Sequence, residues 1–380
     1  MFTVCFLSSA VRCQPLSRAL YLLRGHMNNY FDGSSFTMME SADERLNVIN
    51  GFEQNICSSA INETYNQYPK WWDKTRQVFN SCSSISRSNG QITLVMLSRD
   101  NADFKQYHHL FLSNPTSMKS FGIWAMYQSL QNAELKLIEQ CKTPRTETSL
   151  TGKLTANIDH CASKVQEQYE EHLYLDGTHI NLSEVELQVQ NREKVTGADF
   201  ALLLEWKDDN DDLIICPIYF QAKRVTTVEG DISQYNENTG YQFRVLQAKN
   251  LNSVYIFYNC NTQKTNSNPR IPAVKNVKDI AVYGEPKKTS AVDDVLSLST
   301  FLLDVMVNTT NYITFKDRVS ALRAILSNIQ EDELASVFSL SIDEDAKLKY
   351  QEAYDQYLIY KQKLEEDRKN DSGTSFRPKI

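Results

Sequence analysis

The chain has 380 residues, 41% of them hydrophobic and 23% charged, with 12 glycines and 9 prolines. This composition is typical of a globular protein with about two or three structural units, and it excludes a disordered or fibrous chain. The formal net charge of −7 provides little long-range attraction for nucleic acid, so a polyanionic partner would require a local basic patch or a metal ion at the site.

Cysteine usage and the shortness of the apolar stretches bear on the compartment. The eight cysteines include no CxxC motif and no Cys/His cluster with zinc-like spacing, which favours the reducing cytoplasm. The first eleven residues, MFTVCFLSSAV, have no basic residue before them and are too short to cross a bilayer. We therefore expect a buried segment, or a true start near Met27, rather than a signal peptide. No membrane partner is expected.

The first region, residues 1–150, is predicted to be mostly helical. Apolar residues recur at helical spacing in residues 45–68 and again in residues 122–142. The polar stretch that follows, residues 143–153, contains a proline and a glycine. It predicts a boundary between two regions of the chain.

The second region, residues 151–290, alternates between helices and strands. An order of helix, three strands, helix and strand predicts an α/β core. The expected elements are an amphipathic helix, a half-buried strand, an apolar hairpin, a further helix and an aromatic strand, at 154–175, 181–193, 195–224, 240–250 and 253–260.

The third region, residues 291–380, returns to helix, with helices expected over 292–307 and 315–329. Ser341 and Glu344 have the spacing of a capping box, which predicts the start of a long helix. The tail of this helix is expected to fray. Its apolar stripe is expected to pack in a core or against another subunit, and consists of Ala353, Tyr357, Tyr360 and Leu364.

The hairpin within residues 195–224 is expected to bring three polar residues together. Its turn, the acidic run DDNDD, is centred on Asn210 and is too polar to be buried. Residues equally far from this centre lie opposite each other, so Asp199 is expected opposite Gln221. Lys223 lies two residues further along and shares the face of Gln221. A register shift of one residue would move one strand's side chains to the other face.

A metal ion would explain this group of residues. An isolated charge at the end of a buried sheet is costly to desolvate. A divalent cation held by Asp199 and the amide oxygen of Gln221 would compensate that cost, because hard cations prefer oxygen ligands. Lys223 beside the cation could stabilise charge on a phosphate or orient a water molecule. The alternative interpretation is a surface pair of Asp199 and Lys223 at the end of a sheet.

The pattern Gly-x-Asp, an apolar hairpin and then Gln-x-Lys resembles the PD-(D/E)xK nuclease superfamily in its Mrr-like branch, where glutamine replaces the usual acidic residue. The following helix with its Tyr-Gln pair and the aromatic strand after it are similar to that branch as well. The resemblance covers about residues 154–285. It implies a restriction-endonuclease-like core, which is a mixed sheet flanked by helices, between the N- and C-terminal helical regions.

The resemblance also implies roles for individual residues in a metal-dependent phosphodiesterase. Asp199 becomes the main ligand of Mg²⁺ or Mn²⁺, and Gln221 occupies the position of the second ligand. The carbonyl oxygen of Ala222 is a further metal ligand, and Lys223 is the catalytic lysine. Because Gln221 is neutral, we expect a weaker metal affinity than a carboxylate would give.

These nucleases also place an upstream acid near the metal, and two positions compete for that role. Glu193 has the same strand parity as Val185 and lies just before a glycine bend, so it is preferred. Glu170 is the alternative, although the helical repeat directs it away from the apolar face of its helix.

The resemblance implies a magnesium-dependent nuclease of a bacterial anti-phage defence system. DNA is favoured over RNA as its substrate, and endonucleolytic and exonucleolytic cleavage both stay open. The flanking helices are expected to bind a partner subunit or to build an oligomer. One alternative is an inactive nuclease-like fold for DNA binding or complex assembly, and another is a helical adaptor without metal. The chain contains no Walker A, GxSxG or HExxH motif.

Overall fold

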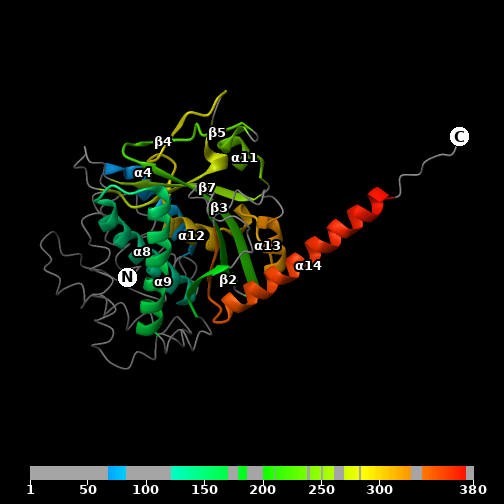
Figure 1. Ribbon diagram of the computed structural model, residues 1–380. Helices are drawn as coiled ribbons and strands as arrows, with labels where there is room; N and C mark the ends of the chain where they lie inside the picture. The colour runs from blue at the N-terminus through cyan, green and yellow to red at the C-terminus, as the bar shows by residue number, and fades with distance from the viewer. Residues whose placement is uncertain are drawn as a thin grey trace, which may run out of the picture.

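The computed structural model describes most of the chain beyond residue 120 and one helix before it, and the described part is an α/β structure built on one mixed sheet (Figure 1). This confirms the predicted α/β class with a mixed sheet flanked by helices. The described residues are 67–82, 121–169, 179–185, 200–208, 210–237, 240–249, 251–260, 269–281, 284–326 and 336–373.

Seven strands form the sheet in the order β1-β11-β2-β3-β7-β8-β10. Neighbouring strands pair antiparallel except β11 with β2 and β3 with β7, which are parallel. The long hairpin of β2 and β3 therefore occupies the middle of the sheet. The strand bounds are β1 Asn181–Val185, β2 Phe200–Lys207, β3 Leu213–Val225, β7 Asn252–Asn259, β8 Ala273–Asn276, β10 Leu296–Ser297 and β11 Ser336–Ser341.

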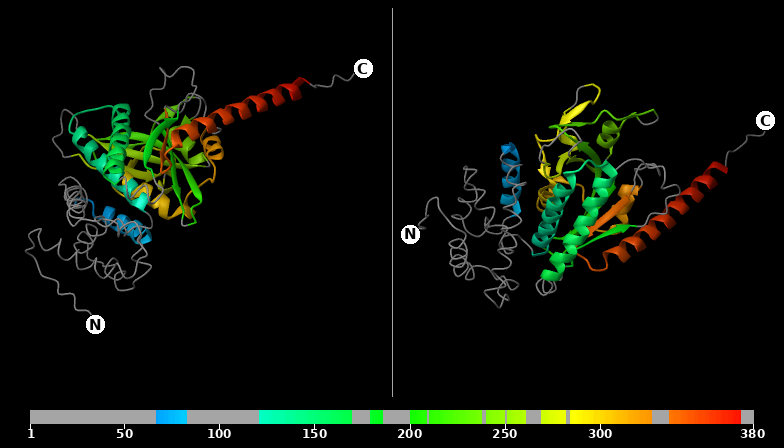
Figure 2. Two further views of the ribbon diagram at one scale, coloured as in Figure 1. Left: turned by 90° about the horizontal axis from the view of Figure 1, so that it is seen from below. Right: turned by 60° about the vertical axis from the view of Figure 1, so that its left-hand side comes forward.

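Alternating side chains of the central hairpin supply two separate cores. Phe200, Leu202 and Phe220 face one core, whereas Leu203 and Tyr219 face the other, as the two-residue period of a strand requires. The first face is covered by α8 (Phe121–Cys141), α9 (Glu147–Gln168) and α12 (Leu298–Val307), and the second by α13 (Arg318–Leu326) and α14 (Ala346–Gly373). Figure 2 shows α14 extending outward from the sheet.

The helix predicted over 122–142 is confirmed by α8, and the next helix begins earlier than predicted. α9 starts at Glu147, where the side chain of Thr146 accepts a hydrogen bond from the backbone N–H of Ser149. Such a cap satisfies one of the free N–H groups at a helix start. The polar stretch after residue 146 is therefore helical, and Leu150 within it and Leu154 directly after it are buried.

The register predicted for the hairpin is confirmed wherever both strands are described. Phe200 pairs with Phe220, and Lys207 pairs with Leu213, which centres the turn on residue 210. At this turn the carboxylate of Asp208 accepts hydrogen bonds from the backbone N–H groups of Asn210 and Asp212. Because this acidic run satisfies its own backbone, the turn closes at one defined position.

Strand β3 changes partner on the side away from β2. Ile215 exchanges both of its backbone hydrogen bonds with Phe315, and from Ile218 onward β3 pairs with β7. Pro217 lies between these two regions. Its carbonyl accepts a hydrogen bond from the side chain of Asn252 at 3.0 Å.

The capping box predicted at Ser341 and Glu344 is wrong. Ser341 is the last residue of β11, a strand absent from the predicted elements. Its hydroxyl donates to Glu205 and accepts from the backbone N–H of Asp343. The long helix α14 begins only at Ala346. Of its predicted apolar stripe, Ala353 and Tyr357 are buried, while Tyr360 and Leu364 are each 39% exposed.

Several further elements complete the described part of the chain. The predicted helix at 240–250 is confirmed by α11 (Gln242–Ala248), and the strand at 253–260 by β7. The remaining elements are α4 (Pro69–Cys82), β4 (Glu229–Asp231), β5 (Tyr235–Asn236), β6 (Gly240–Tyr241), β9 (Lys288–Ser290) and the short 3-10 helices at Val277–Asp279 and Thr309–Asn311. None of the helices within the described ranges has the length and hydropathy needed to cross a membrane.

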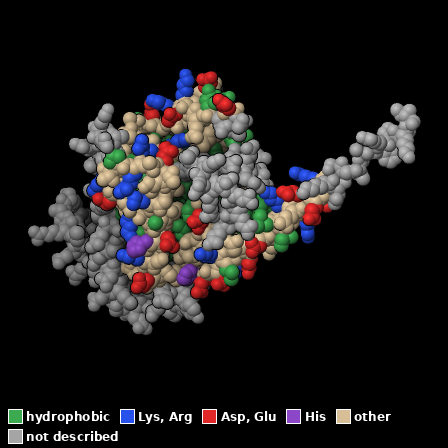
Figure 3. Space-filling view, viewed as in Figure 1, with side chains coloured by type: hydrophobic (Ala, Val, Ile, Leu, Met, Phe, Trp, Pro, Cys, Tyr) green, Lys and Arg blue, Asp and Glu red, His purple; other side chains and the backbone are tan. Residues whose placement is uncertain are grey.

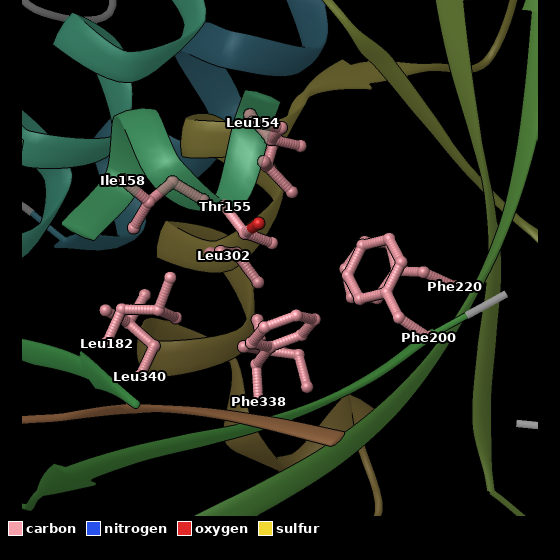
Figure 4. A pocket seen from close by; sticks show the side chains of 11 residues that line it. Leu154, Thr155, Ile158, Leu182, Phe200, Phe220, Leu302, Phe338 and Leu340 are labelled. Carbon is pink, nitrogen blue, oxygen red and sulfur yellow. The ribbon is translucent and has the colours of Figure 1, made fainter. Parts of the chain in front are cut away.

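A small apolar gap separates the hairpin from the helices on its first face (Figure 4). Its volume is about 10 Å³, which is at the lower limit for a single water molecule. It is lined by side chains such as Phe200, Phe220 and Leu302. We therefore regard it as a packing defect of the core and not as a ligand site.

Candidate functional site

Gln221 and Lys223 lie on one face near the end of β3. Both residues are buried, with 3% and 9% of their surface exposed. On the neighbouring parallel strand β7, Tyr255 lies beside Gln221, and Phe257 lies beside Lys223. The prediction that the two polar residues share one face of the sheet is therefore confirmed, and two aromatic residues of β7 lie beside them.

The side-chain amide of Gln221 has an unusual environment. Its oxygen Oε1 is fully buried and has no hydrogen-bond partner among the described residues. An unpaired buried acceptor costs about 1–3 kcal/mol relative to a paired one. A polar atom with this environment is suited to bind a group from outside, either a hydrogen-bond donor or a cation.

The ammonium group of Lys223 is held by two neutral amides. Nζ donates to Oε1 of Gln234 at 2.7 Å and to Oε1 of Gln242 at 3.4 Å. Amide oxygens stabilise an ammonium group without cancelling its charge. The site therefore contains a positive charge with a fixed position.

The direction of the Ala222 carbonyl group follows from the hydrogen bonds of the residues after it on β3. The carbonyl of Val225 accepts from Cys260 beyond β7, whereas the N–H of Arg224 donates to Glu147 on the opposite side. Since backbone groups alternate along a strand, the carbonyl of Ala222 is directed toward the side of β2. The methyl group of Ala222 is buried in the core beneath α9.

The three predicted carboxylates are not among the residues that the structure describes. Asp199, Glu193 and Glu170 all lie outside the described ranges, as does Glu171. Asp199 immediately precedes Phe200, the first residue of β2, and Phe200 pairs with Phe220. Continued by one step, this register would place Asp199 opposite Gln221, which stays a prediction.

Two residues near Lys223 escaped the sequence analysis. Gln234 makes the shorter bond to Nζ, and Asp231 lies within the electrostatic reach of Lys223. The hydroxyl and backbone N–H of Ser233 hold the pKa of the Asp231 carboxyl below its usual value, and the charge of Lys223 acts in the same direction. A signal for Gln234 exists in the sequence, because QY and YQ are mirrored around the run NENTG.

The residues present can hold a hard divalent cation only in part. Within the described ranges, His, Cys, Asp and Glu form no group of three or more that could hold a metal ion. The unpaired amide oxygen of Gln221 and the carbonyl oxygen of Ala222 are both ligand types that Mg²⁺ accepts. Acidic and basic side chains are intermixed on the face shown in Figure 3, and no extended basic patch is visible there among the described residues.

A second buried polar cluster lies toward the turn end of the hairpin, and it is fully paired. The carboxylate of Glu205 is completely buried and receives two hydrogen bonds from Arg318, at 2.9 and 2.6 Å. Tyr350 and Ser341 donate to the same carboxylate. Because every partner comes from a different element, this cluster links α13 and α14 to the strands β2 and β11.

Comparison with protein-family models, with curated proteins and with solved structures gives no match for this chain. The fold class and the geometry around Gln221 and Lys223 are therefore the basis for any functional proposal.

Proposed function

We propose that the protein is a metal-dependent nuclease that hydrolyses phosphodiester bonds of DNA, as an effector of anti-phage defence. Two neighbouring polar groups carry this proposal. One is the buried amide oxygen of Gln221, which has no hydrogen-bond partner among the described residues, and the other is the ammonium group of Lys223, which hydrogen bonds hold in place. The two groups lie two residues apart on one face, where the hairpin register leads toward Asp199.

Each residue has a distinct role in this proposal. Asp199, Oε1 of Gln221 and the carbonyl oxygen of Ala222 would hold Mg²⁺ or Mn²⁺. When bound, such an ion polarises the scissile phosphate and lowers the pKa of a coordinated water molecule. Lys223 places its positive charge where negative charge develops on the phosphate. Glu193, or Glu170 in its place, would complete the acidic side of the site.

A plasmid-cleavage assay with purified protein tests the proposal. We expect cleavage of DNA in Mg²⁺ or Mn²⁺ and none in EDTA. Lys223→Ala and Asp199→Ala should each reduce the rate by roughly 100-fold or more, because each removes electrostatic stabilisation of the transition state. Lys207→Ala is the matched control, since Lys207 is an exposed lysine on the same hairpin at its turn end.

The outcome also separates the active nuclease from the inactive nuclease-like module. The alternative is an inactive nuclease-like module. It is favoured by the neutral side chain of Gln221, which stands where the nucleases that the chain resembles usually have an acid. Tight DNA binding without cleavage in any divalent cation would support an assembly module. Equal cleavage by the wild type and by both alanine variants would show that the activity, if any, resides elsewhere.

A further inference from the structure

The position of the Lys223 ammonium group depends on one short hairpin. Nζ of Lys223 is bonded to Gln234 at 2.7 Å and to Gln242 at 3.4 Å. Gln234 directly precedes β5, and Gln242 directly follows β6. The two amides thus lie at the base of the hairpin formed by β5 and β6, one beside each strand.

This hairpin holds its two amides at a fixed separation. Tyr235 pairs with Tyr241, and the backbone N–H of Gln242 donates to the carbonyl of Gln234 at 2.9 Å. The rings of Tyr235 and Tyr241 meet edge to face with their centroids 5.0 Å apart. Gly240 has φ +80, a backbone conformation that glycine adopts without strain. These contacts join the two sides of the hairpin base and set the separation of the two amides.

The side chain of Gln234 contributes little to the packing of the fold apart from its hydrogen bond to Lys223. It is exposed, whereas the lysine that it binds is only 9% exposed. An exposed side chain that reaches inward to hold a buried charge contributes little apolar burial to stability. Gln242 is half-buried and has further contacts, so it is the less selective position for a test.

The chemistry of the two amides suits a lysine that must act on an anion. An ammonium group has three N–H donors, and the amides take two of them. A carboxylate at either position would form an ion pair and oppose the attraction of Lys223 for a phosphate. Neutral acceptors fix the geometry and leave both the charge and one donor available to a ligand.

We propose that Gln234 and Gln242 are positioning residues, which fix the Nζ of Lys223 for contact with a phosphate oxygen of the substrate. The catalytic role of this positioning rests on the nuclease function proposed above. Whether the hairpin base sets the position and mobility of the ammonium group can be measured without any cleavage.

The test combines NMR of lysine side chains with cleavage kinetics. In protein labelled with ¹⁵N-lysine, the Nζ signal of Lys223 is assigned by its loss in Lys223→Arg. We expect a slowly exchanging ammonium signal in the wild type, and a broadened or lost signal in Gln234→Ala. The kcat of cleavage should fall by roughly 10- to 100-fold with little change in KM, as for a displaced catalytic group.

Two further variants separate positioning from loss of structure. Gln234→Glu retains an acceptor and should keep the ammonium signal, yet it should lower kcat because it pairs the charge of Lys223. Gln234→Asn keeps the amide on a shorter side chain and should behave like Gln234→Ala. Glu237→Ala is the matched control in the same hairpin and should change neither the signal nor the rate.

The possible outcomes distinguish the two proposals. An ammonium signal of Lys223 that is absent in the wild type, or unchanged in both Gln234→Ala and Gln242→Ala, overturns the positioning role. A signal that depends on Gln234 in a protein that cleaves no DNA keeps the positioning role and removes the nuclease function.

Discussion

Phe200 and Phe220 face each other across the central hairpin with their rings parallel, 4.8 Å apart between centroids and 1° between planes. Figure 4 shows the pair at the edge of the apolar gap. They are the outermost described pair of β2 and β3. Stacked aromatic pairs across antiparallel strands stabilise a particular register, and this pair stands one step before the position predicted for Asp199.

A disulfide trap should test whether the register continues by that one step. Ile215 directs its backbone hydrogen bonds away from β2, so the other odd residues of β3 do so too. Asp199 and Gln221 would then form a non-hydrogen-bonded pair with Cα atoms about 4.5 Å apart. This separation suits a disulfide. Asp199→Cys/Gln221→Cys should therefore cross-link under mild oxidation.

Mass spectrometry of the linked peptides detects this bond. Asp199→Cys/Ala222→Cys is the control, because residue 222 has its side chain on the opposite face and should not cross-link. More efficient linkage in the control than in the test pair would mean that the register shifts at residue 199.

Replacing Gln221 by glutamate should strengthen metal binding and lower the stability of the protein without metal. A buried carboxylate without a partner is costly to desolvate, so Gln221→Glu should lower the Tm in EDTA. Binding to the folded state alone raises stability with ligand concentration, so Mg²⁺ should raise the Tm of this variant more than that of the wild type. Gln221→Leu should respond to Mg²⁺ least. An identical Mg²⁺ response in all three proteins, followed by thermal unfolding, would exclude residue 221 as a ligand.

The Glu205–Arg318 pair should be among the most sensitive positions for stability. Arg318→Leu leaves the completely buried carboxylate of Glu205 without its cation, which typically costs about 3–5 kcal/mol. The free energy of unfolding in urea measures this loss. Lys316→Ala, two residues earlier, removes an exposed ion pair with Asp212 and should leave the free energy of unfolding nearly unchanged. Glu205→Leu/Arg318→Leu should recover part of the loss, and a double variant less stable than Arg318→Leu would contradict this account.

The buried carboxyl of Glu134 should make stability fall as the pH rises. Burial raises its pKa from 4.5 to about 7, although Ser299 donates to the carboxylate through both its hydroxyl and its backbone N–H. Between pH 4.5 and pH 7 the unfolded chain releases this proton while the folded protein retains it. The linkage relation then gives a loss of about 3 kcal/mol across that window.

Urea unfolding of Glu134→Gln at several pH values measures this contribution. The amide does not titrate, so the variant should lack this part of the decline and gain stability relative to the wild type as the pH rises from 5 to 8. Glu139→Gln, an exposed position on the same helix, is the control and should follow the wild type. If the stability of Glu134→Gln falls with pH as steeply as that of the wild type, groups other than Glu134 cause the decline.

The hairpin was predictable because local signals agree on it. Two apolar runs flank an acidic turn, and counting outward from the centre of that turn predicts the observed register, so the shared face of Gln221 and Lys223 followed from counting alone. Helices α8 and α11 were likewise predicted from periodicity. These elements depend on residues that are near one another in the chain.

The features that escaped prediction depend on distant partners. β11 has only six residues, SVFSLS, and a run of this length carries too little periodicity to be separated from helix. The partners of Glu205 lie 113 and 145 residues away, so no spacing in the sequence reveals them. The contact of Gln234 with Lys223 spans only 11 residues, but no local pattern predicts it, because it depends on how the chain turns after β4.

Pro217 has a consequence for how the sheet assembles. It has no N–H, and it stands where β3 changes from Phe315 to β7. Neither neighbour can slide past this point without losing a hydrogen bond, because proline offers no donor there. A shift of β7 along β3 toward Pro217 is therefore penalised. The proline thus disfavours one class of misaligned pairing between β3 and β7 as the chain folds.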